Sequence, residues 1–208
     1  MYKDRLDAGN QLAKELAYLK GESVVVLGIP RGGVVVAQPI AEALTAPLSV
    51  LIVRKIGAPG QEELALGAVG PDEKPVWNDS LLKKIQPDPE YLEKMAHQKA
   101  QEVQVRKKAF GADRMPVLKG KTVVVVDDGI ATGATLKAGL MWLKKQVPAK
   151  VVVTVGCAPT DTADAIQREV DEFVCPNVSP NFYAVGQFYE DFREITTEEV
   201  RRILGKNR

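Results

Sequence analysis

Two adjacent carboxylates at the end of an apolar run are the residues most able to do chemistry in this chain. The segment from Val123 to Thr135 reads VVVVDDGIATGAT, so Asp127 and Asp128 follow four valines and precede a glycine-containing loop. Four β-branched residues in a row favour a buried parallel strand. Glycines let backbone N–H groups approach a phosphate, and a helix starting at Thr135 would add its positive dipole end. The pattern predicts a sugar-phosphate site; an aspartate capping an ordinary turn is the alternative.

The same residues resemble the phosphoribosyl diphosphate (PRPP) signature of the type I phosphoribosyltransferases, which has an apolar run, two acids and a loop of the A/T-T-G-x-T type. The resemblance implies that Asp127 and Asp128 hold the ribose 2′- and 3′-hydroxyls. It also implies a 5′-phosphate loop that is made by Gly129, Ala131, Thr132, Gly133, Ala134 and Thr135. The segment is not a P-loop, because no Gly-Lys-Ser/Thr follows the glycines.

A second glycine-rich loop, GIPRGG, spans Gly28 to Gly33 and directly follows an apolar run. It is similar to the pyrophosphate loop of the same family, in which a basic residue precedes glycine. The resemblance assigns diphosphate binding to Pro30, Arg31, Gly32 and Gly33, with Arg31 able to grip two oxygens at once. The family often has a strained cis peptide in this loop, so we expect one beside Arg31. A strand-to-helix turn with a surface arginine is the alternative.

The segment from Arg54 to Val69 reads RKIGAPGQEELALGAV, and its first part, 54–63, is predicted to be a polar, mobile loop that closes over the reaction. Arg54 and Lys55 suit the diphosphate, and the segment resembles, over a short stretch, one found in adenine phosphoribosyltransferases. Glycines and a proline make the part up to Glu63 hinge-like. Glu62 and Glu63 could supply an acid for the base or a water-bridged metal contact, and a solvated loop is the alternative.

The reaction that the resemblance implies explains why such groups are needed. PRPP loses diphosphate from C1, and a nitrogen of a base attacks from the opposite face. Mg²⁺ and cationic side chains would stabilise the departing diphosphate. The two aspartates would position the ribose and offset positive charge on its ring. We therefore predict catalytic roles for Asp127, Asp128, Arg31 and Lys55, diphosphate contacts for Arg54 and Lys55, and an indirect contact of Asp127 and Asp128 with Mg²⁺.

The acceptor end of the site is less defined. The best candidate for a hood over the base is the segment from Pro176 to Phe192, whose rings could stack a flat base: Phe182, Tyr183, Phe188, Tyr189 and Phe192. A C-terminal flap packed on the core or on a second subunit is the alternative. Enzymes for 6-oxopurines usually carry aspartate where this chain has Ala131. The whole pattern is most similar to predicted bacterial phosphoribosyltransferases of unassigned acceptor.

Alternating strands and helices must position these residues. Valine- and isoleucine-rich runs at 24–27, 48–53, 123–126 and 151–155 predict strands, and apolar spacing over 4–20, 34–44 and 135–145 predicts helices. The alternation predicts an α/β fold with a doubly wound parallel sheet of the type I phosphoribosyltransferase kind. Both glycine loops then lie at carboxyl ends of strands. We expect a core over 1–175, with the mobile loop and a long helix inserted at 54–120, and a hood or flap over 176–208.

Composition argues against several other classes of protein. The chain has 208 residues, 45% of them hydrophobic and 26% charged, which is typical of a globular domain. A net charge of +1 provides no basic surface for nucleic acid or an anionic membrane. Cys157 and Cys175 are too few for a disulfide framework and are expected in the core, and His97 is expected on the surface. A charged N-terminus and few cysteines predict a cytoplasmic protein.

Together these patterns predict an Mg²⁺-dependent phosphoribosyltransferase whose substrates are PRPP and a base or amine, acting as a homodimer without nucleic-acid or membrane partners. A PRPP-binding regulatory sensor without catalysis is the alternative. The missing basic stripe counts against an RNA or DNA regulator. A loop that closes over the ligand would be unnecessary in a pure sensor, which favours the enzyme.

Overall fold

A five-stranded parallel sheet forms the centre of the molecule, in the order β2-β1-β6-β7-β9. The computed structural model describes residues 1–112 and 114–206. The strands of this sheet are β1 (Val24–Gly28), β2 (Leu48–Val50), β6 (Thr122–Asp127), β7 (Lys150–Val155) and β9 (Glu172–Val174). The chain runs outward from β1 to β2 on one side and from β6 to β7 on the other. The strand order therefore reverses between β1 and β6, which is where open α/β sheets bind ligands.

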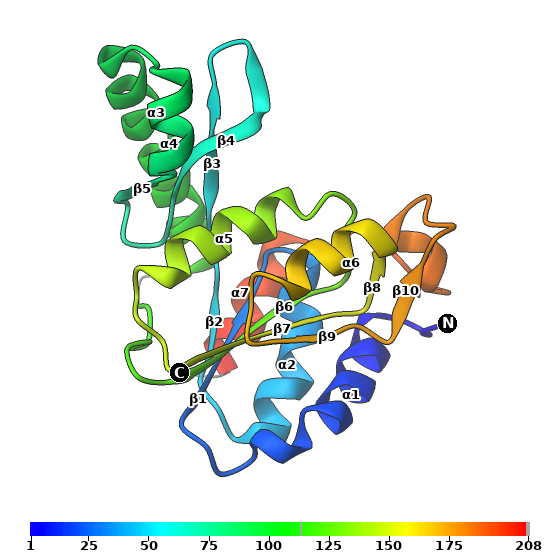
Figure 1. The fold of residues 1–208 in the computed structure, drawn as a ribbon. Helices are drawn as coiled ribbons and strands as arrows, with labels where there is room; N and C mark the ends of the chain where they lie inside the picture. The colour runs from blue at the N-terminus through cyan, green and yellow to red at the C-terminus, as the bar shows by residue number, and fades with distance from the viewer. Residues whose placement is uncertain (113, 207–208) are drawn as a thin grey trace.

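Helices cover both faces of this sheet (Figure 1). The helices α1 (Arg5–Glu15) and α2 (Gly32–Leu44) lie on one face, and α5 (Ala134–Lys144) and α6 (Thr160–Gln167) lie on the other. Along β1, Val24 and Val26 belong to the first helical layer's core, whereas Val25 and Leu27 belong to the second. A strand covered on both faces must be apolar throughout, which is why β1 is a continuous apolar run. The predicted doubly wound fold is confirmed.

The residues that lie between β2 and β6 in the sequence form an arm, which projects from this core (Figure 1). It contains the antiparallel strands β3 (Arg54–Ala58), β4 (Gln61–Val69) and β5 (Pro75–Trp77), and the helices α3 (Asp79–Ile85) and α4 (Pro89–Phe110). The expectation of a polar loop over 54–63 is therefore wrong, because a β-hairpin occupies these residues. Ile56 and Leu66 are fully buried there. The hairpin's register depends on partner strands and on α4, which a local reading of glycines and charges does not detect.

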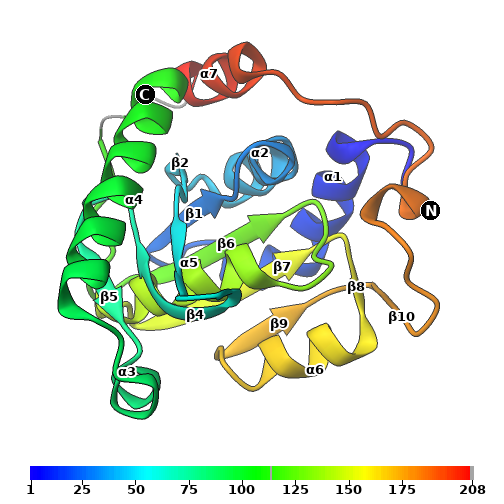
Figure 2. The same ribbon diagram turned by 90° about the horizontal axis from the view of Figure 1, so that it is seen from above.

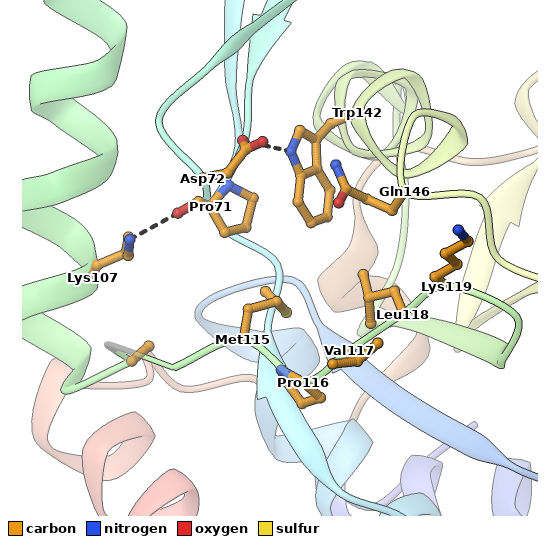
Figure 3. A pocket seen from close by; sticks show the side chains of 11 residues that line it. Pro71, Asp72, Lys107, Met115, Pro116, Val117, Leu118, Lys119, Trp142 and Gln146 are labelled. Carbon is orange, nitrogen blue, oxygen red and sulfur yellow. Dashed lines mark hydrogen bonds between the residues drawn. The ribbon is translucent and has the colours of Figure 1, made fainter.

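Trp142 of α5 attaches the arm to the core (Figure 3). Its indole N–H donates to Asp72 Oδ1 at 2.7 Å, and Lys107 Nζ of α4 donates to the Pro71 carbonyl at 2.8 Å. Gly70 lies against the indole so closely that a Cβ there would be 2.2 Å from the ring. These side chains border a hollow of about 330 Å³. Since it contains none of the predicted site residues, we regard it as part of the arm's attachment.

After β9 at one edge of the sheet, the chain leaves the sheet and ends in a helix that packs on the core (Figure 2). The strands β8 (Cys157–Pro159) and β10 (Asn177–Ser179) form a separate parallel pair, and a 3₁₀ turn, η2, spans Val185–Phe188. The last helix, α7 (Thr197–Lys206), packs on α2 and α4 and buries Val200 and Leu204. A 3₁₀ turn, η1 (Ala17–Leu19), follows α1. The proposed boundary between 175 and 176 stays a prediction.

Cys157 lies in the core and His97 on the surface, as expected, whereas Cys175 lies at the margin of the core. Cys157 is fully buried and Cys175 is half-buried, and both are free thiols. His97 is exposed on α4, where it lies 2.9 Å from the Gln101 amide nitrogen. No helix in the described part of the chain is both long and apolar enough to cross a bilayer.

Candidate active site

A pocket of about 470 Å³ lies where the carboxyl ends of β1 and β6 meet. The loop after β1 contributes Pro30, Arg31 and Gly32, and the end of β6 contributes Asp127 and Asp128. Thr135 of α5 and Arg5 of α1 complete one side, and the segment before α7 completes the other with Phe192, Arg193, Glu194 and Ile195. The structure therefore brings the two predicted glycine loops and the two acids to one place.

The two carboxylates have different surroundings. Asp127 Oδ1 accepts the backbone N–H of Asp128 at 2.9 Å, whereas Asp128 Oδ2 accepts from Arg5 Nε at 2.7 Å. Burial raises the pKa of Asp127 well above its usual range, and the neighbouring Asp128 charge raises it further. The Asp128 amide and the Arg5 cation oppose that rise. The two acids therefore resist carrying full charge together, while both present oxygens at the pocket wall.

The loop after β1 packs on these acids because it has no side chains in the way. A Cβ on Gly32 would lie 1.9 Å from Asp128 Oδ2, and one on Gly33 would lie 2.6 Å from the Val126 carbonyl. Glycine is therefore required at both positions for the two loops to meet. The peptide between Pro30 and Arg31 is cis, as predicted. The Arg31 side chain is 39% exposed, so a ligand in the pocket can reach it.

The loop between β6 and α5 has the backbone of an anion site. Gly133 precedes α5 with φ of 68°, a left-handed conformation that glycine adopts without strain. Thr132 Oγ1 accepts the Ala134 N–H at 3.4 Å, which shapes the turn. Ala131, Thr132 and Thr135 are exposed. Since the first N–H groups of a helix have no intrahelical acceptor and the dipole is positive there, this loop can receive a phosphate.

Comparison with known proteins decides the family. The sequence profile described as "Phosphoribosyl transferase domain" matches residues 2–193 of this chain. The chain belongs to this family. The family predicted from the two glycine loops is thereby confirmed.

Individual members of the phosphoribosyl transferase family support this placement. A predicted phosphoribosyl transferase from Mycobacterium tuberculosis is 44% identical to this chain over 208 residues. The match covers 99% of this chain but 47% of that protein, so the chain spans about half the length of the curated relatives it matches. The crystal structure of TT1426 from Thermus thermophilus superposes with a TM-score of 0.92 at 41% identity, covering 99% and 98% of the two chains.

More distant structures show the shared fold alone. The purine phosphoribosyltransferase from Pyrococcus horikoshii superposes with a TM-score of 0.50 at 21% identity, and the match covers 94% of this chain and 97% of that one. The predicted sheet of the type I phosphoribosyltransferase kind is therefore present in this chain, while the acceptor is left open.

Arg5 is a pocket residue of this phosphoribosyl transferase domain that sequence reasoning missed, as it missed Arg193, Glu194 and Ile195. It is the first residue of α1 and is 8% exposed despite its charge. The spacing of Arg5 along the helix could have indicated its burial, because Arg5 shares a helical face with the buried residues Ala8 and Leu12. The sequence does not tell what that face meets. Only the fold places Asp128 beside it.

Lys55 does not reach the pocket. Its Nζ lies 3.0 Å from Glu63 Oε2 across the hairpin, in a separate hollow between the hairpin tip and α4. Glu62 and Glu63 are exposed in the same hairpin. A catalytic contact of Lys55 would therefore require the arm to move toward the strand ends.

Arg54 pairs with a residue of α4 and does not line the pocket either. Its Nε is buried and lies 3.1 Å from Glu102 Oε2 of α4, without hydrogen-bond geometry. Arg106 lies one turn further along α4. Burial lowers the pKa of Arg106 first, followed by the charges of Arg54 and Arg31. The charges of Arg54 and Arg31 thus both act on Arg106, a residue that sequence reasoning missed.

Most aromatic rings of segment 176–192 pack on other side chains and do not present free faces to a ligand. The Tyr2 and Tyr189 rings are 5.3 Å apart and buried, whereas Tyr183 is 90% exposed. Phe192 lines the pocket, but the Arg5 guanidinium covers one of its faces at 3.8 Å. Phe182 and Phe188 stack on each other. This arrangement favours a packed flap over a hood with free ring faces.

The acid pair is the place to test for Mg²⁺. No group of three or more histidine, cysteine, aspartate or glutamate side chains in the described residues is arranged to hold a metal ion. Mg²⁺ is often held by one or two carboxylates together with substrate phosphates and water. Asp127 and Asp128 fit an ion that arrives with the diphosphate. The indirect role predicted for them stays a prediction.

Proposed function

We propose that this chain transfers the 5-phosphoribosyl group from PRPP to a nitrogen nucleophile and releases diphosphate. The observation that supports this best is the convergence of the acid pair and the Arg31 loop on one pocket at the point where strand order reverses. PRPP carries a phosphate at one end, hydroxyls in the middle and a diphosphate at C1. The site offers a partner for each part: an anion loop for the phosphate, two carboxyl groups for the hydroxyls and an exposed arginine for the diphosphate.

The roles of the chain's own residues follow from that match. The N–H groups of Thr132 to Thr135 would bind the 5′-phosphate at the positive end of α5. Asp127 and Asp128 would accept hydrogen bonds from the ribose hydroxyls. Arg31 would bind the diphosphate, assisted by the bare backbone at Gly32 and Gly33. These contacts would hold the sugar while its C1 is exposed to the incoming nitrogen.

In the transfer, the C1–O bond to diphosphate breaks and a C1–N bond forms, and the nitrogen releases its proton to water or to a base. The sugar ring gains positive charge as the bond breaks, and the acid pair would offset that charge. Bound Mg²⁺ would neutralise part of the diphosphate charge. Arg54 and Lys55 would join Arg31 if the arm closes, which would also exclude water. We further propose a homodimer as the working form.

Titration calorimetry with Mg²⁺-PRPP tests the assignment of the acids. Asp128→Asn keeps the shape of the side chain but removes its charge, so we expect a loss of about 1.5–3 kcal/mol in binding, the scale of a charge-assisted hydrogen bond. Asp164→Asn is the matched control, because Asp164 is exposed on α6 and does not line the pocket. Undiminished affinity in Asp128→Asn, or no PRPP binding by the unaltered protein, would overturn the proposal.

A PRPP sensor is the second candidate. It is favoured by the position of Lys55, whose side chain pairs with Glu63 outside the pocket. A release assay for diphosphate separates the two functions when PRPP is offered with a panel of bases and amines. Release with any acceptor identifies a transferase. PRPP binding without release on the whole panel identifies a sensor.

A further inference from the structure

One guanidinium group connects segments that are far apart in the sequence. Arg5 Nε donates to Asp128 Oδ2 at 2.7 Å, and Arg5 Nη1 donates to the Arg193 carbonyl at 2.8 Å. Its Cζ lies 3.8 Å from the centre of the Phe192 ring. A buried cation is costly unless it is paired and hydrogen-bonded, and Arg5 has both kinds of partner. The group is therefore held in one orientation by a carboxylate, a carbonyl and a ring.

The space around this group leaves little freedom to Asp128. A Cβ on Gly32 would lie 1.9 Å from Asp128 Oδ2 and 2.8 Å from Arg5 Nε. The carboxylate is thus confined between the glycine loop and the guanidinium. On its backbone side, the Asp128 carbonyl accepts from the Tyr189 hydroxyl. One carboxylate oxygen, Oδ2, is committed to Arg5, and the residue lines the pocket.

The segment Phe192–Ile195, which we call the strap, also contacts the other end of the site. Glu194 Oε1 pairs with Arg31 Nη2, and the side chain of Glu194 is 78% exposed. Neighbouring residues of the strap therefore hold two functional groups, Asp128 through Arg5 and Arg31 through Glu194. The acid proposed for ribose and the arginine proposed for diphosphate are linked by this strap in the ligand-free protein.

We propose that Arg5 is a positioning residue, which fixes the orientation of Asp128 for the ribose and anchors the strap that carries the counter-ion of Arg31. The inference rests on the proposed function, since it assigns the ribose to Asp128 and the diphosphate to Arg31. Arg5 acts through Asp128 and the strap and does not itself contact the sugar. Loss of Arg5 frees Asp128 to rotate and loosens the strap, so that Glu194 no longer competes with diphosphate for Arg31.

Two half-ligands, ribose 5-phosphate and inorganic pyrophosphate, each measured by calorimetry with Mg²⁺, report on the two ends separately. In Arg5→Met we expect ribose 5-phosphate to bind about tenfold to a hundredfold more weakly, which is ~1.4–2.8 kcal/mol at 1.4 kcal/mol per factor of ten. Pyrophosphate should bind as tightly as before or more tightly. A purely structural role for Arg5 would weaken both half-ligands together.

Conservative and control variants sharpen the test. Arg5→Lys keeps a cation beside Asp128 but cannot reach Asp128 and the Arg193 carbonyl with one planar fork, so it should recover part of the ribose 5-phosphate affinity. Lys14→Met removes an exposed cation from the same helix and should leave both affinities unchanged. Glu194→Gln should strengthen pyrophosphate binding more than ribose 5-phosphate binding, because it frees Arg31 without altering Asp128.

The outcomes separate this inference from the function on which it rests. If the unaltered protein binds neither PRPP nor the half-ligands, the proposed function and this inference both fail. If it binds them and the Arg5 variants keep the ribose 5-phosphate affinity, only the role of Arg5 is overturned. If Arg5→Met does not fold, as judged by circular dichroism, Arg5→Lys decides. Selective loss of ribose 5-phosphate affinity then supports the inference, and equal affinities or equal losses for the two half-ligands overturn it.

Discussion

The Tyr189 hydroxyl donates a hydrogen bond to the Asp128 carbonyl at 2.5 Å. Tyr189 is 5% exposed, and its ring lies against Tyr2, whose hydroxyl donates to the Gly156 carbonyl at 3.1 Å. The C-terminal segment therefore contacts the backbone of the acid pair through Tyr189. Tyr189 supports the backbone of Asp128, and Tyr2 from the N-terminus packs against Tyr189.

Tyr189→Phe removes this hydroxyl and keeps the ring. The Asp128 carbonyl then loses a buried partner, so we expect the free energy of unfolding to fall by about 0.5–1.5 kcal/mol. PRPP affinity should fall a few-fold, because the end of β6 becomes less constrained. Urea unfolding and calorimetry measure the two effects. Tyr183→Phe is the control, since Tyr183 is 90% exposed; a similar change in both variants would refute the supporting role of Tyr189.

Gly32→Ala tests the close approach of the two loops. The new Cβ would overlap Asp128 Oδ2 at 1.9 Å, so the carboxylate must move away from Arg5. We expect at least a tenfold loss of PRPP affinity and a destabilisation of about 1–3 kcal/mol, typical of overpacking. Gly205→Ala, in α7 with no atom within 4 Å of its Cβ, should instead stabilise the protein by about 0.5–1 kcal/mol. Unchanged PRPP binding in Gly32→Ala would show that the loops do not need this contact.

The ion pair between Glu199 and Arg193 should make stability depend on pH below neutrality. Arg193 first, and then the Thr196 N–H, lower the pKa of Glu199 from its ordinary value of 4.5 to about 2. A lowered folded-state pKa stabilises the protein above the unfolded value, and this stabilisation is lost as the pH falls from 4.5 toward 2. Denaturant titrations over that window should show a shallower pH dependence in Glu199→Gln than in the unaltered protein.

Glu198→Gln is the control for that measurement, because Glu198 is 73% exposed and lies 3.8 Å from Arg201. Arg193 is exposed and Glu199 is partly exposed, so added salt should reduce the difference between the variants. An identical pH dependence in all three proteins at low salt would contradict the prediction.

Hydrogen exchange on residues 54–69 tests closure of the arm. The ladder at its base, where Arg54 pairs with Val69 and Ile56 with Gly67, should be protected without ligand. The register shifts at Gly57, so amides from Gly57 to Glu63 should exchange faster in the free protein. Mg²⁺-PRPP should slow exchange at this tip if the arm closes. No ligand-dependent change there would leave Lys55 without a catalytic role.

The acceptor should not be a 6-oxopurine. Ala131 is exposed in the anion loop and has no carboxylate to meet the ring of hypoxanthine or guanine. A site without that polar partner discriminates against such bases. Turnover on hypoxanthine, guanine, adenine, uracil and orotate should therefore be lowest for the first two. Efficient transfer to either would show that Ala131 does not set acceptor choice.

The sequence by itself determined the sheet, the two glycine loops and the family. These are local signals: the valines before Asp127 favour a strand covered on both faces, and the glycines at Gly32 and Gly133 mark a close approach and a positive φ. The cis peptide beside Arg31 followed from the resemblance and is present.

Only the tertiary structure decided which distant residues complete the site. Arg5 meets Asp128, which lies 123 positions further along the chain, and Arg54 meets α4 and not the pocket lining. The hairpin over 54–69 and the packing of Tyr189 under Asp128 depend likewise on partners outside their own segment. Local patterns record which face of an element is apolar or charged. They do not record which element covers that face, because this is decided when helices and strands pack together.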